Sequence, residues 1–218
     1  MKTAIVIGST GLVGSNLIDL LLENEEYSRV KIFTRRPSGI NHPKLNEFIV
    51  NFDQLHQWQN DLKGDVLYSA LGTTLKKAGN KDAQYMVDYT YQYSAAKAAA
   101  NNGVKYFGLV SAIGADPKSL IFYNRMKGEL DRDVTKLPFE KIIIVRPSGL
   151  LGERKENRPM EKIGIGTSKA LKYIPYFNKY RPIHAKTVAR SLINAIENPD
   201  LKGVHIFNSN ELFNLASP

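Results

Sequence analysis

The chain has 218 residues, of which 43% are hydrophobic and 23% charged, as is typical of a globular protein with one sizeable core. It contains no cysteine, which excludes disulfides, a thiolate nucleophile and thiolate metal ligands. The four histidines are scattered without ligand spacing, so we expect no metal site. No apolar run reaches the roughly 20 residues of a membrane span, and the N-terminus lacks the pattern of a signal peptide. We therefore expect a cytoplasmic protein with no membrane partner.

Much of the net charge of +9 lies in one segment, residues 152–190, which hold ten Lys and Arg against three Glu. Such a segment could attract nucleic acid, an anionic membrane surface or an acidic small substrate, or it could be a solvated face. No recognition helix or aromatic stacking platform is evident there, so we do not expect nucleic acid as a partner. An anionic small-molecule substrate is the alternative kept open, and the oligomeric state is left undetermined.

A glycine-rich turn follows the first predicted strand, Thr3–Ile7. The turn has the sequence Gly8-Ser9-Thr10-Gly11-Leu12-Val13-Gly14, and leucines recur behind it at helical spacing. The first glycine allows a tight turn, the second lets the backbone approach a pyrophosphate, and the third lets the helix pack closely on the sheet. Strand, turn and helix together predict the opening of a dinucleotide-binding unit, with amide groups of the helix start facing phosphate. A plain turn is the alternative, because the spacing is G-x-x-G-x-x-G.

The second predicted strand, Arg29–Thr34, ends in Arg35 and Arg36. An Asp or Glu that would hold the ribose 2′-hydroxyl of NAD is missing about 20 residues after the glycines. Guanidinium groups suit a 2′-phosphate, so the sequence favours NADP(H) over NAD(H), with Arg35 as the first candidate contact. The alternative is a solvated arginine pair at the start of a loop.

Asp53 follows the third predicted strand, Glu47–Phe52. Its carboxylate could accept a hydrogen bond from the adenine amino group at the rim of the sheet. It could equally cap the predicted helix Gln54–Leu62. The sequence leaves both interpretations open.

The rest of the first 150 residues continues to alternate strands with helices. After a fourth predicted strand, the chain passes Gly72 and Thr73, where a glycine and hydroxyl groups suit a close approach to a cofactor, and Leu75–Gly79 is predicted as a loop. Six strands alternating with helices predict an α/β fold, a Rossmann-type doubly wound parallel sheet. The further predicted strands are Val66–Leu71, Tyr106–Ser111 and Lys141–Val145, and the further predicted helices are Asp82–Asn102 and Ser119–Lys136.

The alternation stops after Gly149. Two helices are predicted at Glu161–Tyr173 and Ala185–Asn198, followed by a last strand, Gly203–Phe207. We expect residues 1–218 to form a single domain, with residues 151–185 as a small C-terminal substrate cap over the carboxyl ends of the strands.

The spacing Tyr-x-x-x-Lys occurs three times, as Tyr27/Lys31, Tyr93/Lys97 and Tyr123/Lys127. Only the third pair begins a helix shortly after a strand that ends in a serine, Ser111. That context would bring a serine, a phenol and an ammonium group to the edge where an open α/β sheet binds its ligands. An ordinary exposed helix pair is the alternative.

These three side chains suit proton transfer coupled to hydride transfer. Tyr123 and Lys127 lie one turn apart on a helix face, and a nearby ammonium lowers the pKa of a phenol. The phenol could then exchange a proton with a carbonyl or alcohol, while Ser111 holds the same oxygen and Lys127 reaches the nicotinamide ribose.

The chain resembles the atypical short-chain dehydrogenase/reductases, in the branch similar to the human HIV Tat-interacting protein. The resemblance implies a Rossmann-type fold, NADP(H), the catalytic set Ser111, Tyr123 and Lys127, and a position of Pro147 beside the nicotinamide. Asp88 stands where many relatives carry Asn, so the resemblance does not extend to a proton relay through that helix. The motifs that carry it are the glycine turn, Ala70-Leu71-Gly72-Thr73-Thr74, Gly114-Ala115-Asp116, Tyr123-Asn124-Arg125-Met126-Lys127, Gly128-Glu129 and Arg146-Pro147-Ser148-Gly149.

The sequence therefore predicts an NADP(H)-dependent oxidoreductase that acts on a carbonyl or secondary alcohol of a small substrate. A non-catalytic NADP(H)-binding regulator and a sugar-epimerase-like enzyme are the alternatives. The substrate and the direction of the reaction do not follow from the sequence.

Overall fold

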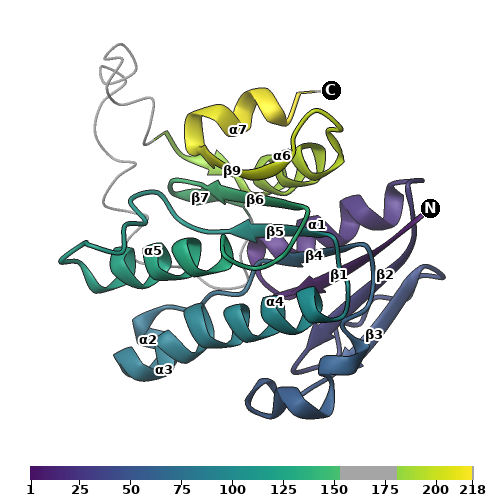
Figure 1. Ribbon diagram of the computed structural model, residues 1–218, viewed down its shortest axis with the longest axis horizontal. Helices are drawn as coiled ribbons and strands as arrows, with labels where there is room; N and C mark the ends of the chain where they lie inside the picture. Colours follow the sequence, from purple (N-terminus) through teal and green to yellow (C-terminus); the bar gives the residue numbers. More distant parts are fainter. Residues whose placement is uncertain (153–180, 218) are drawn as a thin grey trace.

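The computed structural model describes residues 1–152 and 181–217. Its centre is a seven-stranded sheet in the order β3-β2-β1-β4-β5-β6-β9, with every neighbouring pair parallel (Figure 1). This arrangement confirms the predicted Rossmann-type fold. The strands are β1 (Lys2–Ile7), β2 (Tyr27–Thr34), β3 (Leu45–Ile49), β4 (Val66–Ser69), β5 (Tyr106–Val110), β6 (Lys141–Arg146) and β9 (Gly203–Asn208).

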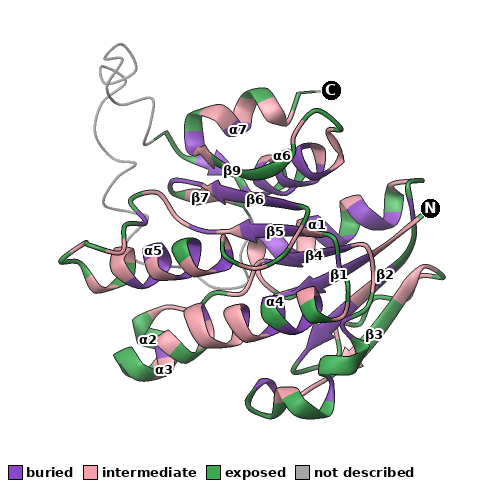
Figure 2. Ribbon diagram, viewed as in Figure 1, coloured by how far each residue is buried: buried purple, intermediate pink, exposed green. Residues whose placement is uncertain are grey.

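Helices cover both faces of the sheet. In β1, Ala4 and Val6 belong to the core under α1 and α6, while Ile5 and Ile7 belong to the core under α4 and α5. This alternation follows from the two-residue period of a strand, and it explains why β1 is apolar from Ala4 to Ile7. Figure 2 shows the buried strands between the two helical layers. The helices are α1 (Leu12–Glu23), α6 (Ala185–Glu197) and α7 (Ser209–Leu215) on one side, and α4 (Tyr91–Asn101) and α5 (Phe122–Val134) on the other.

The segment predicted as a loop at Leu75–Gly79 is instead a short helix, α2 (Leu75–Ala78). The Thr74 side chain accepts a hydrogen bond from the Lys77 amide and caps the helix. Gly79 ends it with a φ of 89°, which favours glycine. The prediction missed this helix because a single turn carries too little periodicity to recognise.

The region after β3 also differs from the prediction. The third strand pairs with β2 earlier than expected, with Leu45 opposite Val30. The predicted helix is two short 3₁₀ helices, η1 (Phe52–Gln57) and η2 (Gln59–Asp61). The Asn51 side chain caps η1 by accepting from the Asp53 amide, so Asp53 is not the N-cap.

The long helix predicted at Asp82–Asn102 is continuous but not uniform. It consists of α3 (Lys81–Tyr85), a π-helical turn η3 (Met86–Thr90) and α4. Turns of this kind are rare and occur often at functional sites. Here the π-helical turn carries Asp88, which is 1% exposed.

The C-terminal part contains one helix that was not predicted. In α7, the Asn208 side chain and the Glu211 side chain cap each other's backbone amides, a pattern visible in the sequence. Most of the predicted cap, including the helix Glu161–Tyr173, lies outside the described residues. At its two ends, β7 (Leu150–Leu151) pairs in parallel with β8 (Ile183–His184).

Candidate active site

Because the strands of the central sheet are parallel, their carboxyl ends meet at one edge. In sheets of this kind, ligands bind where the strand order reverses, which here is between β1 and β4. Most of the predicted site residues directly follow strands at this edge. They are the glycine turn after β1, Arg35 and Arg36 after β2, Leu71–Thr73 after β4, Ser111 after β5 and Pro147 after β6.

The glycine turn packs against the end of β4. Gly8 has a φ of 84°, and a Cβ built on it would lie 2.4 Å from the Ala70 carbonyl carbon. A Cβ on Gly14 would lie 2.0 Å from the Gly8 oxygen, so α1 reaches its position only because residue 14 lacks a side chain. The Ser9 hydroxyl is buried and has no hydrogen-bond partner among the described residues. A phosphate oxygen at this helix start would satisfy it.

Arg35 and Arg36 are both exposed at the outer part of the edge. The Tyr91 hydroxyl donates a hydrogen bond to Asp53. Burial, followed by this bond and the charge of Asp53, raises the pKa of Tyr91 to about 12, and the charge of Arg35 opposes the rise. Arg35 and Asp53 thus both act on the Tyr91 phenol. The residue predicted to bind the 2′-phosphate and the residue predicted to bind the adenine therefore belong to one cluster.

The end of β4 is fixed to the π-helical turn. The Thr73 amide donates to Asp88 Oδ2 at 2.9 Å. Gln92 donates to the Asp88 carbonyl at 2.7 Å and accepts from the Ser69 hydroxyl at 2.7 Å. These bonds hold the backbone of Leu71–Thr73 beside the glycine turn.

Lys127 of α5 is 2% exposed, and its Nζ lies 4.0 Å from Asp88 Oδ1. Tyr123 lies one helical turn earlier on the same face and is 38% exposed, so it is not turned into the core. The Ser111 amide donates to the Val145 carbonyl at 2.8 Å, which fixes Ser111 beside β6. Its hydroxyl is buried and has no hydrogen-bond partner in the described part of the chain. Asp88, at the position where the resemblance has Asn in many relatives, therefore forms an ion pair with this lysine.

The other two Tyr-x-x-x-Lys pairs lie elsewhere. Tyr27 is fully buried, and its hydroxyl is 2.9 Å from that of Tyr68 in the core. Lys97 is exposed on α4. Neither pair follows a strand end at the carboxyl edge.

The loop after Ser111 packs closely on α5. A Cβ on Gly128 would lie 2.2 Å from the Asp116 carbonyl carbon, so a larger residue at position 128 would push the loop away. The Asp116 amide also donates to the Asn124 carbonyl at 3.0 Å. On the other side, the Ile113 amide donates to the Pro147 carbonyl at 3.0 Å. The loop is therefore held between α5 and the end of β6.

The sequence analysis missed Asp131, one turn beyond Lys127. It is 2% exposed, and its Oδ2 accepts from Arg146 Nε at 2.9 Å. Burial raises the pKa of Asp131, while the Ser111 hydroxyl, Arg146 and Lys127 oppose this rise. The spacing Tyr123, Lys127, Asp131 would have pointed to a third residue on the same helix face.

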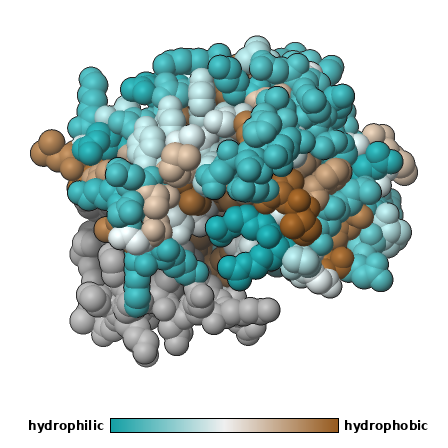
Figure 3. All heavy atoms as spheres, turned by 90° about the horizontal axis from the view of Figure 1, so that it is seen from below, coloured by the Kyte–Doolittle hydropathy of each residue, from teal (hydrophilic) through white to brown (hydrophobic). Residues whose placement is uncertain are grey.

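Two exposed hydrophobic side chains precede α5 in the chain. Leu120 is 97% and Ile121 is 63% exposed. Seen from below, the molecule is largely hydrophilic, and hydrophobic side chains gather in separate patches (Figure 3).

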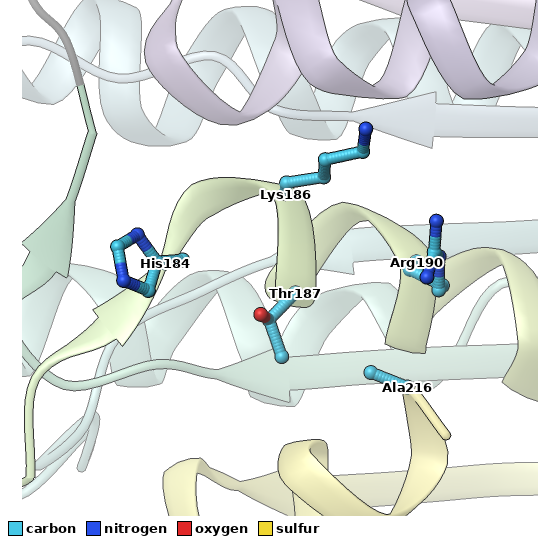
Figure 4. Close-up of a pocket in the computed structure, with 5 residues that line it drawn as sticks. All are labelled: His184, Lys186, Thr187, Arg190 and Ala216. Carbon is cyan, nitrogen blue, oxygen red and sulfur yellow. The ribbon is translucent and has the colours of Figure 1, made fainter. Parts of the chain in front are cut away.

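A cavity of about 330 Å³ lies at the start of α6. It is lined by His184, Lys186, Thr187, Arg190 and Ala216, and in Figure 4 Lys186 extends toward α1. None of these residues belongs to the predicted catalytic set. Within residues 1–152 and 181–217, no three His, Asp or Glu side chains gather as metal ligands would. In the same ranges no helix has the length and apolarity that crossing a membrane requires.

Comparison with known proteins gives the family. A family model described as NAD(P)H-binding matches residues 8–199. The chain belongs to this family. Protein FMP52-1, mitochondrial, of Scheffersomyces stipitis is 33% identical over 98% of both chains. Protein fmp52, mitochondrial, of Aspergillus fumigatus is 38% identical over 74% of this chain and 72% of its own. These relatives are atypical short-chain dehydrogenase/reductase-like proteins, which confirms the resemblance. The prediction of a cytoplasmic location is wrong, because these relatives are named mitochondrial.

Solved structures show the same fold at low identity. MoeE5 in complex with UDP-glucose and NAD is 16% identical, with a TM-score of 0.71 over 96% of this chain and 79% of that chain. UDP-N-acetylglucosamine 4-epimerase from Methanobrevibacter ruminantium M1 is 17% identical, with a TM-score of 0.70 over 98% and 80%. These structures show the fold, and the family model gives NAD(P)H binding.

Proposed function

We propose that this protein is an NADP(H)-dependent oxidoreductase that acts on a carbonyl or secondary alcohol of a small substrate. The observation that carries the proposal is one edge of the sheet that combines a glycine turn, a buried Lys127 and two buried hydroxyls that have no hydrogen-bond partner among residues 1–152 and 181–217. The hydroxyls are those of Ser9 and Ser111. Unpaired buried hydroxyls are costly, so their presence favours a ligand that completes them.

The residues at this edge fit a dinucleotide. Amides of the turn Gly8–Gly14 and the Ser9 hydroxyl would hold the pyrophosphate, and a Cβ at Gly14 would collide with the Gly8 carbonyl of that turn. Arg35 and Arg36 would bind a 2′-phosphate, with Asp53 beside the adenine. Leu71–Thr73 and Pro147 would border the nicotinamide half. When bound, NADP(H) supplies or accepts the hydride.

The protein's own groups would handle the proton. In carbonyl reduction, Tyr123 donates a proton to the substrate oxygen, and Lys127 lowers the pKa of that phenol. Ser111 hydrogen-bonds the same oxygen and fixes its position. Asp88, 4.0 Å from Lys127, offsets part of the ammonium's positive potential.

The test is NADPH consumption with a panel of carbonyl compounds, comparing wild type with Tyr123→Phe. We expect Tyr123→Phe to lower kcat by about 100-fold or more while NADPH binding is unchanged. Tyr93→Phe is the matched control, because Tyr93 belongs to a Tyr-x-x-x-Lys pair on α4, and its kcat should equal that of wild type. The proposal fails if wild type consumes no NADPH, or if Tyr123→Phe is as fast. Tight NADPH binding without turnover would favour a non-catalytic regulator.

An epimerase-like enzyme is the second candidate, favoured by structural neighbours that are sugar-nucleotide 4-epimerases. Such an enzyme would interconvert two substrate stereoisomers without net consumption of cofactor. The relatives' names support a mitochondrial location.

A further inference from the structure

The buried charges at the carboxyl edge of the sheet form two opposite pairs. Lys127 and Asp88 are 2% and 1% exposed, and Lys127 Nζ lies 4.0 Å from Asp88 Oδ1. Asp131, which is also 2% exposed, accepts a hydrogen bond from Arg146 Nε at 2.9 Å. When ionised, these four side chains sum to no net charge. A neutral residue at position 88 would leave the same region with one unit of positive charge.

Asp88 lies against the backbone that follows β4. Its Oδ2 accepts from the Thr73 amide at 2.9 Å, and a Cβ built on Gly72 would lie 3.5 Å from its Oδ1. Gln92 fixes the backbone of Asp88 by donating to its carbonyl at 2.7 Å. The proposed function assigns Leu71–Thr73 to the nicotinamide half of the cofactor. On that assignment, the Asp88 carboxylate adjoins the part of the site that receives the nicotinamide.

The two oxidation states of the cofactor differ in charge at the nicotinamide ring. The ring is a cation in NADP⁺ and neutral in NADPH, whereas the phosphates, the riboses and the adenine are the same in both. A negative charge nearby attracts the cationic ring and has little effect on the neutral one. Because Asp88 is buried, solvent and salt screen this attraction only weakly. Its carboxylate should therefore favour the oxidised form.

We propose that Asp88 is a specificity-determining residue that raises the affinity for NADP⁺ relative to NADPH by balancing the charge of Lys127. The inference rests on the proposed oxidoreductase function and adds an electrostatic preference between the two oxidation states. In carbonyl reduction, a hydride carries two electrons from the ring to the carbonyl carbon, while Tyr123 gives its proton to the oxygen. That step leaves one positive charge on the ring, which the Asp88 carboxylate stabilises.

The test measures cofactor binding and requires no turnover. NADPH is titrated by its fluorescence, and NADP⁺ by displacement of NADPH. The readout is the Kd for NADP⁺ divided by the Kd for NADPH, because contacts common to both forms cancel in this ratio. Asp88→Asn keeps the size of the side chain and removes one negative charge, and many relatives carry Asn at this position. We expect it to raise the ratio about tenfold.

A purely structural role of Asp88 would raise both Kd values of Asp88→Asn equally, and an unchanged ratio overturns the proposal. The double variant Asp88→Asn/Lys127→Met removes both charges of the pair, so its ratio should return to that of wild type. A ratio that stays raised in the double variant would show that charge is not the cause, and would equally overturn the proposal. Asp133→Asn is the control, because Asp133 is partly exposed on the same helix as Lys127, and it should leave the ratio unchanged.

The same titrations separate this inference from the proposed function. Wild type that binds NADP⁺ and NADPH but turns over no carbonyl compound or alcohol would contradict the oxidoreductase. The Kd ratios would still decide whether the charge of Asp88 sets the preference between the two forms.

Discussion

A single methyl group at Gly14 should disrupt the glycine turn. The substitution Gly14→Ala places a Cβ 2.0 Å from the Gly8 oxygen and 2.8 Å from the Gly8 carbonyl carbon. Ordinary contacts of this kind exceed about 3.4 Å, and both clashing atoms belong to the backbone, which cannot rotate away. The start of α1 must therefore move by more than an ångström relative to Gly8.

Two opposing effects set the change in the free energy of unfolding that Gly14→Ala causes. Overpacking at a rigid site costs about 1–3 kcal/mol or more, and at this short distance we take the upper part of that range. Ala in a helix interior is favoured over Gly by about 1 kcal/mol. The net destabilisation is about 1–2 kcal/mol, which for a chain of this size lowers Tm by about 2–8 °C. The free energy of NADPH binding should fall by more than the free energy of unfolding, because the displaced amides of the turn no longer point at the pyrophosphate.

The assay combines thermal unfolding with NADPH fluorescence titration. We expect the Kd of Gly14→Ala for NADPH to rise at least about tenfold, equivalent to 1.4 kcal/mol. Gly149→Ala is the matched control, because a Cβ there meets no atom within 4 Å in the part of the chain that the structure describes, and its Tm should equal that of wild type. Wild-type NADPH affinity in Gly14→Ala would refute the assignment of this turn as the phosphate site.

Three further predictions concern the cofactor, the core and pH. Arg35→Ala should raise the Kd for NADPH by about tenfold and leave that for NADH unchanged in parallel titrations, whereas equal losses would contradict a 2′-phosphate contact. Tyr27→Phe should cost about 1–3 kcal/mol in urea unfolding, because the buried Tyr68 hydroxyl loses its partner, and adding Tyr68→Phe should cost less than the sum of the single changes. Hydrogen bonds from Arg132 above all, and also from Lys136 and Tyr89, hold the pKa of Asp133 far below its ordinary value. Since this pKa is depressed in the folded state, the stabilisation is complete above the unfolded pKa of about 3.9 and is lost as the pH falls through the folded pKa. Asp133→Asn should therefore lower Tm at pH 7 and progressively less in acid, and a Tm difference independent of pH would contradict this.

The sequence by itself determined the features that depend on local periodicity and short motifs. The strand–turn–helix at the N-terminus and the alternation of strands and helices predicted the parallel sheet. Because the strands are parallel, Ser111 and Pro147, which follow two strands, were predicted to lie at the same edge of the sheet. The predicted bounds of helices and strands differ from the structure where no long periodic run exists, as at α2, η1 and the third strand.

Only the tertiary structure decided which side chains are buried and what they contact. It showed that the hydroxyl of Tyr27, a residue the sequence context had already set aside, lies at hydrogen-bond distance from that of Tyr68 in the core. It also brought Lys127 to Asp88, and Asp131 to Arg146, across different elements. The physical reason is that a helical or strand pattern fixes which face a residue occupies, whereas the partner of a buried charge is supplied by the strand or helix that packs against that face.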